Sequence, residues 1–190
     1  MTPALLIHYC STLVWIFPPI RQYRGNFFYF FLILAFCDII APVAQGVFHY
    51  NPSIVYIFGS YFLILSIVGI NLQKPNILSA AVGFLITFLL VYSSWLDLIW
   101  IIVIIHLVIV CLIIKSVLAQ FIIEHKAGIF HILLILYELT IIFKFLFLIL
   151  EESTGYLFFY STTFVQIAFG IAFMIFSDFE KASQHGVQNK

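Results

Sequence analysis

Apolar stretches about as long as a membrane is thick follow one another along almost the whole chain. A helix needs about 20 residues to cross about 30 Å of hydrocarbon, because it rises about 1.5 Å per residue. Seven stretches come near this length: Pro3–Ile20, Phe27–Phe48, Ser53–Ile70, Pro75–Tyr92, Leu96–Lys115, Gly128–Leu150 and Tyr156–Phe176. The pattern predicts an all-α, polytopic membrane protein with a bundle of seven transmembrane helices.

The composition leaves too few polar residues to cover a soluble core. Of all residues, 64% are hydrophobic and 8% are charged, whereas about 25% of a typical soluble domain is charged. Most side chains must therefore contact lipid, and we expect the bilayer to be a partner of this surface. The formal net charge is +0, so no basic patch is available for nucleic acid. Nucleic-acid binding is excluded as a function class.

Basic residues gather on one side of the predicted spans. The cytoplasmic loops of membrane proteins are enriched in Lys and Arg near span ends. If the N-terminus lies outside, all basic residues except Lys144 fall on the cytoplasmic side: Arg21, Arg24, Lys74, Lys115, Lys126, Lys181 and Lys190. We therefore expect an external N-terminus, a cytoplasmic C-terminus and a location in the plasma membrane. Residues 1–176 are predicted to form a single seven-helix domain, followed by a short cytoplasmic tail over 177–190.

The fifth apolar stretch can continue beyond its predicted end at Lys115. The segment Val117–Ile123 remains largely apolar before the break at Glu124–Gly128. It predicts either an amphipathic cytoplasmic extension that offers a docking surface, or a helix that tilts in the membrane and frays. The tail over 177–190 is too short to fold by itself. We therefore expect any output to pass through a protein partner at the cytoplasmic loops.

Polar side chains recur at one depth in several predicted spans. They lie near the middle of the second, fifth, sixth and seventh spans as Asp38, His106, Glu138 and Gln166. An ionised group at the centre of the bilayer costs about 2.5–3.5 kcal/mol on insertion scales. Such residues are normally turned toward protein and partnered. Their common depth predicts a polar layer at the membrane midplane.

The surroundings of Asp38 and Gln166 support this layer. Asp38 shares its helix face with small or polar neighbours, and Pro42 cannot donate a backbone hydrogen bond to the Asp38 carbonyl group. This carbonyl is therefore expected to be available at mid-membrane, and Pro42 is a candidate hinge. In the last span, Thr163, Gln166 and Gly170 form a stripe of small and polar residues that is typical of helix interfaces.

The sequence indicates structural roles for Lys144 and His106. Lys144 is six residues from Glu138, which places the two about 120° apart around the helix. We expect Lys144 to extend outward to Glu151 and Glu138 to find another partner. The helix of His106 is otherwise apolar. It is predicted to be peripheral, with His106 as an isolated hydrogen-bonding group.

The polar layer has two interpretations. In the first, Asp38, Glu138, His106, Gln166 and Thr163 surround a site for a ligand or a proton, since burial favours neutral carboxyl groups. In the second, the same residues only hold helices together, because polar contacts in membranes contribute about 0.6–2 kcal/mol each.

Signatures of catalysis and of metal binding are missing from the sequence. It contains no G-x-S-x-G, no H-E-x-x-H and no Gly-rich phosphate loop. The cysteines lack C-x-x-C or metal-ligand spacing, and the histidines do not pair as haem ligands. We therefore expect no enzyme activity, no metal and no cofactor.

The end of the first span resembles the PQ-loop and SWEET-type transporters. Those proteins carry a Pro-Gln pair near this membrane face, where this chain has Pro18-Pro19. The second half of the chain has no matching proline after its fourth span, as a three-helix repeat would require. The resemblance is confined to this short segment and assigns no family.

Three functions are consistent with these features. The preferred one is a small sensor or signalling subunit that binds a ligand or proton at the polar layer and acts through a partner. The second is a transporter of a small polar solute, with hinges such as Pro42. The third is an accessory or assembly subunit of a membrane complex, without a ligand of its own.

Overall fold

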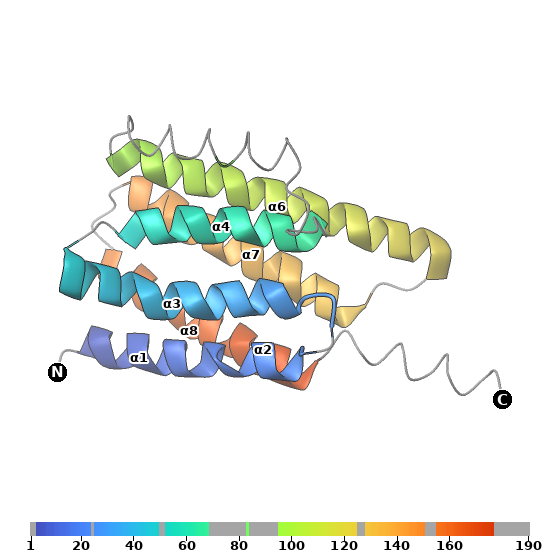
Figure 1. Cartoon of the computed structure of the whole chain (residues 1–190), viewed down its shortest axis with the longest axis horizontal. Helices are drawn as coiled ribbons and strands as arrows, with labels where there is room; N and C mark the ends of the chain where they lie inside the picture. The colour runs from blue at the N-terminus through green and yellow to red at the C-terminus, as the bar shows by residue number, and fades with distance from the viewer. Residues whose placement is uncertain are drawn as a thin grey trace.

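Helices account for every regular element of the described chain. The computed structural model in Figure 1 describes residues 3–23, 25–49, 52–68, 83, 95–124, 128–150 and 155–176. Its helices are α1 (Pro3–Trp15), α2 (Phe17–Arg21), α3 (Phe28–Phe48), α4 (Pro52–Val68), α6 (Trp95–Glu124), α7 (Ile129–Ile149) and α8 (Gly155–Ile175). The predicted span Pro75–Tyr92 lies outside the described residues, except for Gly83.

Three of these helices are long and apolar enough to cross a membrane. They correspond to the segments Phe28–Phe48, Leu98–Leu118 and Ile129–Ile149. Ser53–Val68 and Tyr160–Ile175 are shorter apolar helices. Large apolar side chains are exposed on the outward faces, including Phe36, Ile104 and Phe164. These are the properties of a membrane protein, whose outer surface contacts lipid instead of water.

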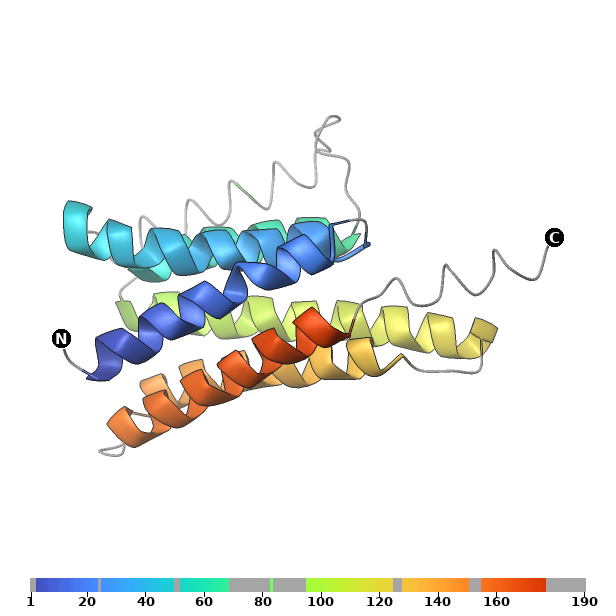
Figure 2. The same ribbon diagram turned by 90° about the horizontal axis from the view of Figure 1, so that it is seen from below.

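The helices pack side by side in a closed ring. Figures 1 and 2 show the described helices lying roughly along one axis; α3 runs opposite to α1, and α7 runs opposite to α6 and α8. Around the ring, α3 contacts α4, α4 contacts α6, α6 contacts α7, α7 contacts α8, and α1 contacts both α8 and α3. Each helix can therefore direct one face toward a common centre.

The predicted first span is divided into two helices by its proline pair. Pro18 and Pro19 have no backbone N–H to bond to the carbonyl groups of Val14 and Trp15. Helix α1 therefore ends at Trp15, and both prolines lie in the first turn of α2, where helices accept proline. A single continuous helix over this stretch was the wrong expectation.

Glycine allows two pairs of helices to approach closely. A Cβ atom at Gly59 of α4 would lie 2.1 Å from Cys37 Sγ of α3, and one at Gly170 of α8 would lie 2.6 Å from Val14 Cγ1 of α1. Small residues at such crossings are typical of helix packing in membranes. Cys37 is followed by Asp38 in α3, so the α3–α4 crossing also brings the middle of α4 close to Asp38.

An aromatic cluster fills one half of the bundle. Its buried rings are Trp15, Phe27, Phe30, Phe31, Phe130, Tyr137 and Phe173, which make repeated stacked and edge contacts. Most come from the start of α3, the start of α7 and the end of α8. Gln22 closes this end, because its fully buried amide donates hydrogen bonds to the Phe173 and Phe176 carbonyl groups at 3.4 and 3.0 Å.

Helix α6 differs from its predicted position and extends further than its neighbours. It packs between α4 and α7 and buries Ile99, Ile102, Ile109 and Ile113. The expectation of a peripheral helix was therefore wrong. The predicted extension past Lys115 is helical through Glu124, and its last turns project beyond the other described helices in both views (Figures 1 and 2).

Candidate functional site

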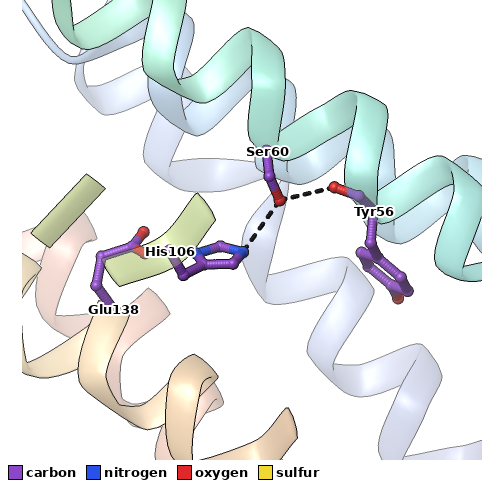
Figure 3. A network of polar contacts seen from close by, with 4 residues as sticks. All are labelled: Tyr56, Ser60, His106 and Glu138. Atoms are coloured by element: carbon purple, nitrogen blue, oxygen red, sulfur yellow. Dashed lines mark hydrogen bonds and ion pairs between the residues drawn. The ribbon is translucent and has the colours of Figure 1, made fainter. Parts of the chain in front are cut away.

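His106 is at the centre of a buried hydrogen-bond network that joins three helices (Figure 3). Its Nδ1 atom lies 2.6 Å from Glu138 Oε2 of α7, and its Nε2 atom lies 3.1 Å from Ser60 Oγ of α4. The Ser60 hydroxyl group donates to the Tyr56 carbonyl at 2.7 Å. Glu138 is fully buried, and His106 is 4% exposed. His106 is therefore not an isolated group facing lipid, which corrects the sequence interpretation.

The directions of these hydrogen bonds limit the protonation of the pair. Because Ser60 donates to Tyr56, its oxygen accepts from the Nε2–H of His106. The Nδ1 atom then either accepts from a protonated Glu138 or, in an imidazolium ring, donates to the Glu138 carboxylate. Both arrangements contain the same number of protons and no net charge. A neutral pair costs less to bury than an isolated charge.

The same geometry indicates what the network can do chemically. Serine, histidine and a carboxyl group lie in the order found in hydrolase triads. However, a serine nucleophile must give its proton to the histidine, whereas the Ser60 hydroxyl is directed at the Tyr56 carbonyl. The network is therefore arranged to hold helices and a proton, and not to activate Ser60.

A cavity of about 390 Å³ lies inside the ring of helices. This volume is within the range of small-molecule sites. Its apolar walls include Trp15, Leu34 and Leu63, and its polar walls include Asp38, Gln45, Ser53, Tyr56, Ser60, His106, Tyr137, Lys144 and Gln166. The lining residues come from α1, α3, α4, α6, α7 and α8.

The cavity reaches from the middle of the bundle to one of its ends. Asp38 and Gln166 lie near the centres of α3 and α8, whereas Gln45 and Leu148 lie near the ends of α3 and α7. Ser53 lies at the beginning of α4. The aromatic cluster occupies the opposite half, with Trp15 and Tyr137 at the boundary between cluster and cavity.

Two opposite charges face this cavity. The Asp38 carboxylate accepts no hydrogen bond and makes no ion pair with any residue that the structure describes. The Lys144 ammonium group donates to Gln166 Oε1 at 3.2 Å and interacts electrostatically with Asp38. Lys144 thus contacts the polar layer. The predicted contact of Lys144 with Glu151 lies outside the described residues and stays a prediction.

The remaining predicted site residues differ in their relation to the cavity. Glu138 does not line it and is connected to it through His106. Thr163 is buried but is not among the lining residues. Pro42 lies inside α3, which continues through it without interruption.

Sequence reasoning did not assign Gln45, Tyr56 or Tyr137 to the site. Tyr56 precedes Ser60 by one helical turn, and Tyr137 is adjacent to Glu138 in the chain. Helical spacing could therefore have indicated Tyr56, since residues four apart share a face. Helical spacing did not indicate Tyr137. It is adjacent to Glu138 in the chain, and adjacent residues of a helix point in different directions.

Metal coordination has no support in the described part of the chain, where no group of three His, Cys, Asp or Glu residues could hold an ion. The site must therefore be interpreted from its own hydrogen bonds and charges. No family model, curated protein or solved structure matches this chain.

Proposed function

We propose that this chain is a seven-span membrane sensor subunit with its N-terminus outside and its C-terminus in the cytoplasm. In this proposal, the central cavity binds a small polar ligand, and binding is passed to a protein partner on the cytoplasmic side. The observation that carries the proposal is the Asp38 carboxylate, which faces the cavity without a hydrogen-bond partner among the described residues. Residues that only join helices would be paired with each other.

The position of the cavity supports a ligand that arrives from outside. The cavity extends toward the end where α3 and α7 finish and α4 begins, which is the external end in the proposed topology. The opposite half is filled by the aromatic cluster. Such a packed layer separates the cavity from the cytoplasmic side, as a receptor requires. A transporter would need to open this layer in each cycle.

The projecting end of α6 supports a partner on the cytoplasmic side. Phe121 and Ile122 lie in its last turns, and Ile122 is 73% exposed. The same helix carries His106, which is hydrogen-bonded to α4 and α7. A ligand that alters the packing at His106 would thus act on a helix that continues to the partner surface.

Accessibility of an introduced cysteine tests this proposal. Gln45→Cys would be made after replacing the native Cys10, Cys37 and Cys111 by alanine, and a membrane-impermeant methanethiosulfonate would be applied to intact cells and to inside-out vesicles. We expect modification from the outer side only. Ile104→Cys, on an exposed apolar face of α6, is the matched control and should not react, because lipid excludes the charged reagent.

The alternative functions predict different results in this experiment. A transporter would expose the Gln45 position to reagent from both sides as it changes conformation. An accessory subunit without a ligand site would show no modification from either side. Modification from the cytoplasmic side alone would contradict the proposed orientation.

A further inference from the structure

A second groove, separate from the central cavity, lies where α1 and α2 meet α3 on the outside of the bundle. Its volume is about 490 Å³, and its described lining residues are all aliphatic or aromatic. Pro19 of α2 and Ala35 of α3 are buried in this groove, whereas Ile20 and Phe36 are exposed beside them. The short side chains of Pro19 and Ala35 therefore leave space between the two helices, and larger apolar side chains form its edges.

The groove has the length of one membrane leaflet. On α3 its lining residues run from Phe28, at the start of the helix, to Ile39, near the middle of the helix. At about 1.5 Å per residue this stretch is about 16 Å long, which is close to half of the about 30 Å of hydrocarbon in a bilayer. A partner transmembrane helix would pack along both leaflets, whereas an acyl chain occupies one leaflet only. The groove therefore fits a lipid acyl chain better than it fits a protein helix.

A positive charge lies at the Phe28 end of this groove. Tyr23 is at the same end, because its ring packs edge-on against Phe28 with the ring centroids 5.4 Å apart. Arg21 is the last residue of α2, two positions before Tyr23. Its side chain is exposed and makes no ion pair or hydrogen bond with any residue that the structure describes. A guanidinium group can donate two parallel hydrogen bonds to a phosphate group, and a basic residue at the membrane surface favours anionic lipids.

We propose that this groove binds one phospholipid with an anionic head group, with an acyl chain between α2 and α3 and the phosphate group at Arg21. The acyl chain gains contacts with fixed side chains that the surrounding fluid lipid does not offer. The arginine supplies the preference for an anionic head group. The lipid site is separate from the central cavity, and it does not depend on the proposed sensor function.

Native mass spectrometry of the full-length chain in detergent tests the inference. The protein would be titrated with phosphatidylglycerol or with phosphatidylcholine of the same acyl chains, and circular dichroism would verify the helicity of each variant. One saturable lipid adduct should form, and it should form about 5-fold more tightly with phosphatidylglycerol, because one arginine faces the extra negative charge. Equal affinity for both lipids, or adducts without a saturable site, would overturn the inference.

Two variants distinguish the contact with the acyl chain from the contact with the head group. Leu32→Trp should abolish the saturable adduct with both lipids, because the indole ring fills the groove. Its control, Ile40→Trp, adds the same ring at an exposed position of α3 outside the groove and should bind lipid normally.

Arg21→Gln should remove the preference for phosphatidylglycerol and retain the binding of phosphatidylcholine. Its control, Lys115→Gln, removes an exposed basic residue of α6 and should change neither. An adduct that survives Leu32→Trp, or a preference that survives Arg21→Gln, would contradict the assignment. Loss of a protein dimer in Leu32→Trp, with no lipid adduct in the wild type, would assign the groove to a second copy of the chain and overturn the inference.

Discussion

Replacing His106 by leucine should destabilise the protein strongly, although this residue is the only polar side chain in the middle of its helix. The substitution removes the partner of Glu138 Oε2 at 2.6 Å and the partner of Ser60 Oγ at 3.1 Å. The other carboxyl oxygen, Oε1, is buried without a hydrogen bond to any described residue. Glu138 would thus be left inside the bundle with neither oxygen satisfied.

The expected magnitude follows from this loss of partners. Removing one member of a buried charged pair typically costs about 3–5 kcal/mol in soluble proteins. In membranes the unfolded chain also finds polar partners, so hydrogen bonds average about 0.6 kcal/mol. Because the contact is short, charge-assisted and fully buried, we expect His106→Leu and Glu138→Leu each to cost about 2–3 kcal/mol.

The double variant measures the interaction between His106 and Glu138 separately from their other contacts. His106→Leu with Glu138→Leu removes both polar groups together, and it leaves an apolar contact next to Phe145, whose ring lies beside His106. Replacing a whole buried pair by apolar residues is often close to neutral. The double variant should therefore be no less stable than either single variant, which gives a coupling energy of at least about 2 kcal/mol.

Reversible unfolding in mixed micelles measures these free energies, with helicity followed by circular dichroism. Thr140→Val is the control on α7, because its hydroxyl group bonds to the Leu136 carbonyl of its own helix, and it should cost less than about 0.6 kcal/mol. If the two single effects add within about 0.5 kcal/mol, the pair is not coupled and the argument for a buried His106–Glu138 unit is refuted.

Three further predictions test other parts of the molecule. A reporter inserted after Lys74 should be cytoplasmic and one inserted at Glu152 external, as shown by protease protection; the reverse would contradict the seven-span topology. Gly170→Val should destabilise the α1–α8 crossing by about 1–3 kcal/mol in the same unfolding assay, whereas Gly46→Val, where a Cβ meets nothing within 4 Å, should not; equal effects would refute the close crossing. Gln22→Leu should lower the melting temperature, because the C-terminal carbonyl groups of α8 lose a buried donor, and an unchanged melting temperature would show that this bond does not stabilise the bundle.

The sequence by itself determined that the chain is a helical membrane protein. This followed from apolar runs of membrane length, which can satisfy their backbone hydrogen bonds in lipid only as helices. The described helices α3, α7 and α8 end within a few residues of the predicted limits. The proline pair at Pro18 and Pro19 was also visible, but its effect on the first helix was not predicted, because apolar length alone does not record missing backbone donors.

The sequence also predicted a common depth for the polar side chains. Depth follows from counting residues along a helix, since the rise per residue is fixed. Asp38, His106 and Gln166 line one cavity, and a polar layer at the membrane midplane stays a prediction. The side of a helix that packs against protein can be predicted from the sequence only where small or polar residues mark it, as they do around Asp38.

Only the tertiary structure decided which polar groups meet. Helix α6 is apolar around its whole circumference near His106, so its sequence contains no signal for the side that faces α4 and α7. That side is fixed by the packing of α6 against α4 and α7, which buries Ile102, Ile109 and Ile113. The partners of Glu138 and Lys144 follow from the same packing, because a side chain at a given depth can reach only the helices that the bundle places beside it.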